Sequence, residues 1–141
     1  MRVCVIDGRG GGLGRLLVAG LHGAIGGSHK IVALGTNAVA AQAMKEAGAS
    51  CVGVGSQAIA QTVPTVDVIV APLNLVLSGS MLGEVTHDIV QAILSSKAKK
   101  VLLPVNRAHM EIVGSEDHTL DGLIARSLLR VSRFVSGSRQ F

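Results

Sequence analysis

The chain of 141 residues is 48% hydrophobic and only 16% charged. Its length suits a single domain, which we place at 1–141. No apolar run approaches the roughly 18 residues of a membrane span, and the start "MRVCVIDG" lacks the apolar core of a secretory signal. We therefore expect a cytoplasmic protein without a membrane partner. The formal net charge of +4 suits an acidic ligand, but aromatic residues make up 1% of the chain. Without platforms for base stacking, nucleic acid is not an expected partner.

Strands and helices are predicted to alternate along the chain. Apolar, β-branched runs typical of strands lie at 3–6, 31–34, 51–54, 66–71 and 100–103. Segments with helical periodicity lie at 13–25, 37–47, 80–96 and 119–135. We place Cys4 and Cys51 inside strands, as small hydrophobic residues. The alternation predicts an α/β fold with a single doubly wound, mainly parallel five-stranded sheet.

The stretch "VIDGRGGGLG", residues 5–14, holds five glycines directly behind the first apolar run. A strand, a glycine-rich loop and a helix in this order let backbone N–H groups at the helix N-terminus hold a diphosphate. No Gly-Lys-Ser/Thr ends the loop, which argues against a P-loop. A tight turn alone explains one or two glycines better than five. We therefore predict a small-molecule nucleotide site formed by Asp7, Gly8, Arg9, Gly10, Gly11, Gly12, Leu13 and Gly14.

The glycine spacing departs from the usual G-x-G-x-x-G, because position 13 is Leu. The pattern Gly8-x-x-x-Gly12-x-Gly14 instead resembles the T-G-x-x-x-G-x-G of short-chain dehydrogenases, with Asp7 in place of the threonine. The tyrosine that serves those enzymes as acid/base has no counterpart, since the chain contains no tyrosine.

Over most of its length the chain also resembles an uncharacterised bacterial family of Rossmann-like proteins, a domain of unknown function. The matching stretches are "VIDGRGGGLG", "ALGTNAVAAQAM", "MLGE" and "SSKAKKVLLPVNR". This resemblance implies a Rossmann-like fold and a nucleotide site, but no activity.

The predicted cofactor is NADP or NAD. A dinucleotide site often carries Asp or Glu at the end of the second strand, where the acid holds the ribose hydroxyls. Here that place reads "ALGTN" and holds no acid. Gly35, Thr36 and Asn37 are predicted to line it, and the two polar side chains would hydrogen-bond the ribose. Arg9 offers a positive charge to a 2′-phosphate, which favours NADP over NAD; a solvated loop arginine is the alternative interpretation.

Two further loops should reach the ligand, because ligands of doubly wound sheets bind at the carboxyl ends of the strands. These loops read "APLNLVLSGSMLGE" and "LPVNRAHMEIVG". Pro72, Asn74 and Asn106 are predicted contacts of the cofactor. His109 is the candidate general acid/base, with Glu111 as the carboxylate that orients it. Ordinary loop hydrogen bonding and a two-ligand metal site remain the alternatives for this pair.

Two classes of function remain open. A nucleotide-binding or sensing module is favoured, because 141 residues leave little room beyond a Rossmann core. The alternative is a small oligomeric NAD(P)-dependent oxidoreductase that uses the loop after the fifth strand. A homo-oligomer, most simply a dimer, is expected in both cases, because the apolar content exceeds what so small a domain hides. We expect its contact at 80–96 and 73–77.

Overall fold

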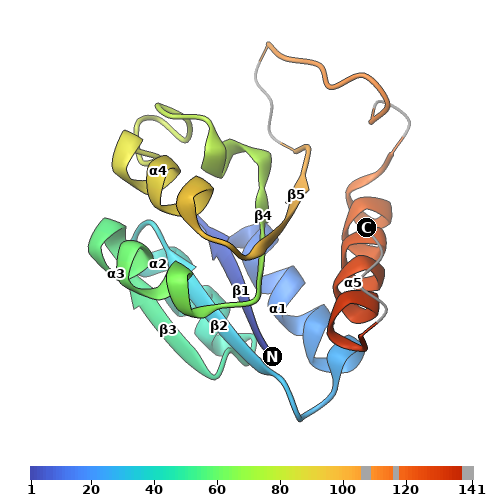
Figure 1. The fold of residues 1–141 in the computed structure, drawn as a ribbon. Coiled ribbons are helices and arrows are strands. Elements are labelled where there is room, and N and C mark those ends of the chain that lie inside the picture. The colour runs from blue at the N-terminus through green and yellow to red at the C-terminus, as the bar shows by residue number, and fades with distance from the viewer. Residues whose placement is uncertain (106–108, 116–117, 138–141) are drawn as a thin grey trace.

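The computed structural model describes residues 1–105, 109–115 and 118–137, which contain one sheet of five parallel strands. The strands stand in the order β3-β2-β1-β4-β5 (Figure 1). In the register of the sheet, Val3 lies between Ile31 of one neighbour and Val68 of the other. The predicted α/β fold with a doubly wound parallel sheet is confirmed. The strand bounds are β1 Arg2–Asp7, β2 Lys30–Gly35, β3 Cys51–Val54, β4 Val68–Pro72 and β5 Lys99–Leu103.

Helices cover both faces of the sheet (Figure 1). One face carries α1, α2 and α5, and the other carries α3 and α4. No helix of the described residues is long and apolar enough to cross a membrane. The bounds are α1 Gly12–Ile25, α2 Ala38–Glu46, α3 Gly55–Thr62, α4 His87–Ser95 and α5 Leu120–Val135, with short 3-10 turns η1 Val63–Thr65 and η2 Leu73–Val76.

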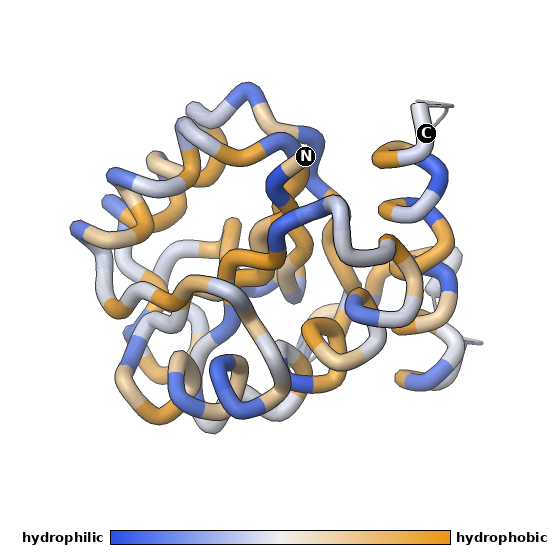
Figure 2. Tube along the Cα trace, turned by 90° about the horizontal axis from the view of Figure 1, so that it is seen from below, coloured by the Kyte–Doolittle hydropathy of each residue, from blue (hydrophilic) through white to orange (hydrophobic). Residues whose placement is uncertain are grey.

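The core has two layers because successive side chains of a strand point to opposite faces. Val3 and Val5 pack in the layer that contains Leu17 of α1. Cys4 and Ile6 pack in the other layer, which contains Ile93 of α4. Figure 2 shows the hydrophobic segments gathered in the interior, with hydrophilic stretches toward the outside. A strand buried on both faces is apolar at every position, which is why β1 reads as a continuous apolar run.

The predicted helix at 80–96 is wrong in its first part, because α4 begins only at residue 87. Residues 79–86 form turns in which Met81 and Leu82 take left-handed φ angles of 57° and 56°. Thr86 ends this segment and caps α4, since its hydroxyl accepts a hydrogen bond from the N–H of Ile89 at 3.4 Å. Leu82, which falls in the first part of the predicted helix, is 94% exposed.

Two other features were not specified by the sequence prediction. The short α3, which buries only Ile59 among its own residues, was not predicted. Cys4 and Cys51 both lie in strands, as predicted, but Cys4 is buried, which raises its pKa to about 12, whereas Cys51 is exposed. Cys51 lies on β3, an edge strand of the sheet, where its side chain is accessible.

Candidate functional site

The glycine loop joins the carboxyl end of β1 to the N-terminus of α1 and is held from inside by Asp7. The Asp7 carboxylate accepts hydrogen bonds from the N–H of Gly8 at 2.8 Å and from the N–H of Gly14 at 2.7 Å. Burial raises the pKa of Asp7, while these two hydrogen bonds act in the opposite direction. Asp7 was predicted as a ligand contact. In the structure, both of its carboxylate oxygens accept hydrogen bonds from the backbone of the glycine loop, so Asp7 stabilises the conformation of that loop.

Three of the five glycines of the loop are required by packing within the chain itself. A Cβ at Gly8 would lie 2.6 Å from both the Met81 sulfur and the Thr36 hydroxyl, and a Cβ at Gly14 would lie 2.7 Å from the Met44 sulfur. Gly11 has a φ of 72° and lies against the backbone of the N-terminal part of α2, where a Cβ would come within 2.9 Å. At these positions any side chain meets atoms of the folded chain, so glycine is needed for packing.

Neither packing nor backbone conformation requires glycine at positions 10 and 12. A Cβ at either position would meet no atom within 4 Å, and neither residue has a left-handed φ. The N–H groups of Gly10, Gly12 and Leu13 also form no hydrogen bond with the described part of the chain. The first N–H groups of a helix lack partners within it, and the helix dipole favours an anion close to them. The open part of the loop is therefore suited to a phosphate group.

The end of β2 lies directly beside this loop. The N–H of Thr36 donates to the backbone oxygen of Asp7 at 3.0 Å, and the side-chain amide of Asn37 donates to the backbone oxygen of Arg9 at 2.9 Å. Asn37 also caps α2 by accepting from the N–H of Ala40. The structure thus brings together the residues predicted after the first and second strands. Gly35 packs against the backbone of α2, where a Cβ would lie 2.6 Å from the nitrogen of Ala41.

Glu84 joins these two loops, and its role was not predicted. It lies between β4 and α4, yet its Oε1 accepts hydrogen bonds from Thr36 Oγ1 at 2.6 Å, Asn37 Nδ2 at 2.9 Å and the N–H of Arg9 at 2.9 Å. The hydrogen bond from Thr36, followed by that from Arg9, holds the pKa of Glu84 below its usual range. The side chain is therefore a carboxylate at neutral pH.

A cavity of about 370 Å³ opens beside the glycine loop. It includes Asn74, which follows β4, while Pro72 is the last residue of that strand. The loops after β1, β4 and β5 all contribute to the wall, which is where a doubly wound sheet places its ligand. The cavity is lined by Arg9, Asn74, Gly79, Ser80, Met81, Leu82 and Met110.

Backbone strain is concentrated around this cavity. The non-glycine residues with left-handed φ in the described chain are Arg9, Met81, Leu82 and His109, and each lines the cavity or adjoins a residue that does. Such conformations cost on the order of 1 kcal/mol each and are enriched at functional sites. Because glycine adopts a left-handed φ without strain, the non-glycine side chains at these four positions lower the stability of the fold.

The predicted acid/base pair has not formed a unit in the structure. His109 and Glu111 are both exposed, and the described residues contain no hydrogen bond between them. No group of three His, Cys, Asp or Glu residues that could hold a metal ion occurs in the part of the chain that is described. Asn106, the remaining predicted contact, lies outside the described residues.

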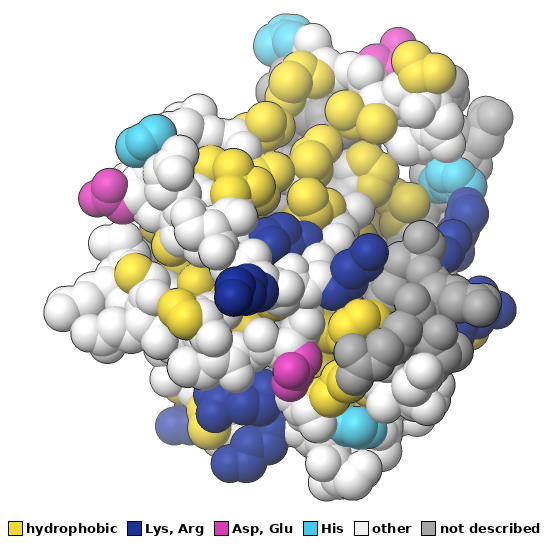
Figure 3. Space-filling model, in the orientation of Figure 1, with side chains coloured by type: hydrophobic (Ala, Val, Ile, Leu, Met, Phe, Trp, Pro, Cys, Tyr) yellow, Lys and Arg dark blue, Asp and Glu magenta, His cyan; other side chains and the backbone are white. Residues whose placement is uncertain are grey.

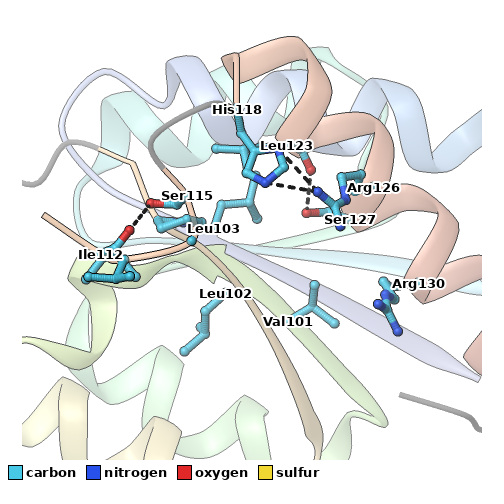
Figure 4. Close-up of a pocket in the computed structure, with 13 residues that line it drawn as sticks. Val101, Leu102, Leu103, Ile112, Ser115, His118, Leu123, Arg126, Ser127 and Arg130 are labelled. Atoms are coloured by element: carbon cyan, nitrogen blue, oxygen red, sulfur yellow. Dashed lines mark hydrogen bonds between the residues drawn. The ribbon is translucent and has the colours of Figure 1, made fainter.

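A second hollow lies between β5 and α5, away from the glycine loop. Its volume is about 360 Å³, and its walls include the apolar side chains of Val101, Leu103 and Leu123. Figure 3 shows hydrophobic side chains gathered over this part of the molecule. At its rim Arg126 points toward His118, with its Nη1 3.0 Å from Nε2 of the ring (Figure 4). This hollow contains none of the predicted site residues.

A family model described as "Domain of unknown function (DUF3842)" matches residues 2–136. The chain belongs to this family. The expected membership of an uncharacterised family is thus confirmed. A comparison with curated proteins finds no match.

Among solved structures, the chain is similar to a dodecameric FMN-dependent UbiX-like decarboxylase from Escherichia coli O157:H7. The two are 15% identical, with a TM-score of 0.52 over 97% of this chain and 94% of that chain. At this identity the likeness shows the fold alone.

The predicted cofactor is wrong. We expected NADP or NAD from the glycine loop and the end of the second strand, but the enzyme that shares the fold is FMN-dependent. The glycine spacing that suggested a dinucleotide has a partly internal cause, because Gly8 and Gly14 are required by packing. Glycine spacing therefore did not identify the nucleotide.

Proposed function

We propose that this member of the DUF3842 family binds a phosphorylated nucleotide-type cofactor at the carboxyl edge of its sheet, with flavin mononucleotide as the first candidate. One observation carries the proposal: the N–H groups of Gly10, Gly12 and Leu13 form no hydrogen bond with the described chain, and a Cβ at Gly10 or Gly12 would meet no atom within 4 Å. A phosphate would accept hydrogen bonds from these groups, and the positive end of the α1 dipole would stabilise its charge.

The residues around the loop fit the rest of a flavin mononucleotide. The side chains of Met81, Leu82 and Met110 give the neighbouring cavity apolar walls, as a planar ring system requires. Its volume of about 370 Å³ falls within the range of small-molecule sites. Arg9, which also lines the cavity, supplies positive charge near the phosphate. The fold shared with an FMN-dependent enzyme makes this cofactor the first to test.

A binding or sensing module is the role that we favour. His109 is exposed and has no carboxylate partner among the described residues, so the structure adds no support for it as an acid/base. The second candidate is an enzyme that uses the bound cofactor. The left-handed conformations of Arg9, Met81 and Leu82 favour it, because strain of this kind is enriched at catalytic sites.

We further propose a homo-oligomer, a state that the decarboxylase with the same fold also has. The expected contact at 73–77 is not suitable, because Leu75 is fully buried within the chain. Exposed apolar side chains instead surround the hollow beside β5, which has a neighbouring strand on one side only. Ile112 and Val113 line the hollow, and Leu120 and Leu129 are exposed on the adjacent helix α5. Such a patch at a sheet edge favours contact with a second copy.

Titration calorimetry with FMN, riboflavin and inorganic phosphate tests the cofactor proposal. FMN should bind, and riboflavin should bind at least about a hundredfold more weakly, because it lacks the group that the three N–H groups would hold. Inorganic phosphate should bind weakly and compete with FMN. Equal affinity for FMN and riboflavin would contradict a phosphate site, and no binding of FMN would overturn the proposal.

A further inference from the structure

Glu84 places a carboxylate beside the end of β2, although the residues at the end of that strand include no acid. The end of β2 reads "ALGTN", without the acid that often holds the sugar hydroxyls of a nucleotide there. The structure brings Glu84 to this place from the β4–α4 loop, 48 residues away from Thr36 along the chain. The carboxylate lies between the end of β2 and the glycine loop, since it binds groups of both.

The position of this carboxylate is fixed by groups that are themselves fixed. Asn37, one of its donors, also caps α2 and binds the backbone of the glycine loop. Thr36, a second donor, binds Asp7 through its backbone. The third donor is the backbone N–H of Arg9, which belongs to the loop. A polar group held in this way binds a ligand without first losing its own conformational freedom.

The three donors bind the same oxygen of Glu84. Oε1 accepts from Thr36, Asn37 and Arg9, whereas Oε2 accepts no hydrogen bond from the described residues. A carboxylate oxygen accepts hydrogen bonds and donates none. Its partner in a ligand must therefore be a donor, and a hydroxyl group of a sugar or ribityl chain has this property. A second phosphate would be repelled.

We propose that Glu84 is a specificity-determining residue whose Oε2 accepts a hydrogen bond from a hydroxyl group of the polyol next to the ligand phosphate. The inference rests on the proposed function, because it needs a phosphate at Gly10, Gly12 and Leu13. It assigns the ligand to the class of monophosphates that carry a free hydroxyl close to the phosphate, to which FMN belongs. A phosphate without a polyol would gain nothing from Glu84.

The variant Glu84→Gln separates recognition from support. The amide oxygen of Gln can still accept from Thr36, Asn37 and Arg9, while an NH₂ group replaces the second oxygen. The matched control is Thr36→Val, which removes the 2.6 Å hydrogen bond to Glu84 but leaves the carboxylate in the site. Calorimetry measures the affinity of each protein for FMN and for inorganic phosphate, and thermal unfolding shows that each is folded.

We expect Glu84→Gln to weaken FMN binding about tenfold or more, because a charge-assisted hydrogen bond is lost. Its affinity for inorganic phosphate should stay within about twofold of the wild type, and Thr36→Val should weaken FMN binding far less. Equal weakening by both variants would make Glu84 a support of the loops only. Tighter phosphate binding in Glu84→Gln would show that the carboxylate blocks an anion site. Either result overturns the inference, as does an unchanged affinity for FMN. Wild-type protein that fails to bind FMN overturns the proposed function as well, so the two failures are distinguishable.

Discussion

The substitution Gly12→Val tests the proposed phosphate site most directly, because it adds a side chain only where the chain itself leaves space. Gly12 is the first residue of α1, and a Cβ there meets no atom within 4 Å. Helix propensity favours valine over glycine by a few tenths of a kcal/mol, so the free energy of unfolding should change by less than about 1 kcal/mol. The fold should therefore survive the substitution.

The effect on binding should be much larger. Hydrogen bonds to a charged group contribute about 1.5–3 kcal/mol each, and a valine side chain would separate the phosphate from at least two of the three N–H groups. A loss of about 3 kcal/mol corresponds to an affinity for FMN that is more than about a hundredfold weaker. Calorimetry measures this loss, and chemical denaturation measures the stability of the same variant.

Gly23→Val is the matched control for this experiment. Gly23 lies in the same helix, is exposed and also has nothing within 4 Å of an added Cβ, but it lies in the last turns of α1 rather than the first. The control should bind FMN as the wild type does. If Gly12→Val also kept the wild-type affinity while the wild type binds FMN, the phosphate would not lie at the N-terminus of α1, and the reasoning from the open glycines would be refuted.

Three further predictions concern stability. Gly14→Ala should lower the free energy of unfolding by about 1–3 kcal/mol in urea denaturation, because the added Cβ would lie 2.7 Å from the Met44 sulfur; Gly23→Ala should leave it unchanged or slightly raised. Leu75→Ala should cost about 2–5 kcal/mol, whereas Leu82→Ala should stay within about 0.5 kcal/mol, since Leu75 is fully buried and Leu82 is 94% exposed; equal effects would contradict the turn at 79–86. Burial raises the pKa of Asp7, so the folded state binds this proton more tightly than the unfolded state. The contribution of Asp7 to stability should therefore be most favourable below about pH 4 and fall as the pH rises through the pKa of the folded state. Asp7→Asn should remove this part of the pH dependence of the free energy of unfolding. An unchanged pH dependence in the variant would contradict this role of Asp7.

Much of the fold could be predicted because it depends on local patterns. β1, β2 and β4 are buried on both faces, so each reads as a short apolar run, and Thr119 marks the start of α5 because its hydroxyl caps the helix. The start of α4 was misplaced for a local reason as well. Its expected first turns carry hydrophobic residues at helical spacing, but the glycines at 79 and 83 take left-handed φ angles and end the pattern.

The candidate site was predictable only where its residues are close in sequence. The glycine loop follows a strand and precedes a helix, and both neighbours are visible in the sequence. Glu84 gave no comparable signal, because its partners Thr36 and Asn37 are 48 and 47 residues away. Nothing about its own neighbours distinguishes it from a solvated loop carboxylate. Such a contact depends on how the β4–α4 loop folds back, which residue spacing does not specify.

The five glycines of "DGRGGGLG" have two different causes, and only one of them concerns a ligand. Gly8 and Gly14 leave room for side chains of the same molecule, and Gly11 lies against α2 with a left-handed φ. A fold of this kind would need these three even if it bound nothing. The loop also encloses the carboxylate of Asp7, whose negative charge opposes the binding of an anion at the N-terminus of α1. In the proposed site, a phosphate would therefore be held by the N–H groups of Gly10, Gly12 and Leu13, which have no partner in the described chain, while Asp7 maintains the shape of the loop. This division explains why glycine spacing alone suggested the wrong cofactor: three of the glycines report how the chain packs, and the two that face open space report only that a ligand has room to approach.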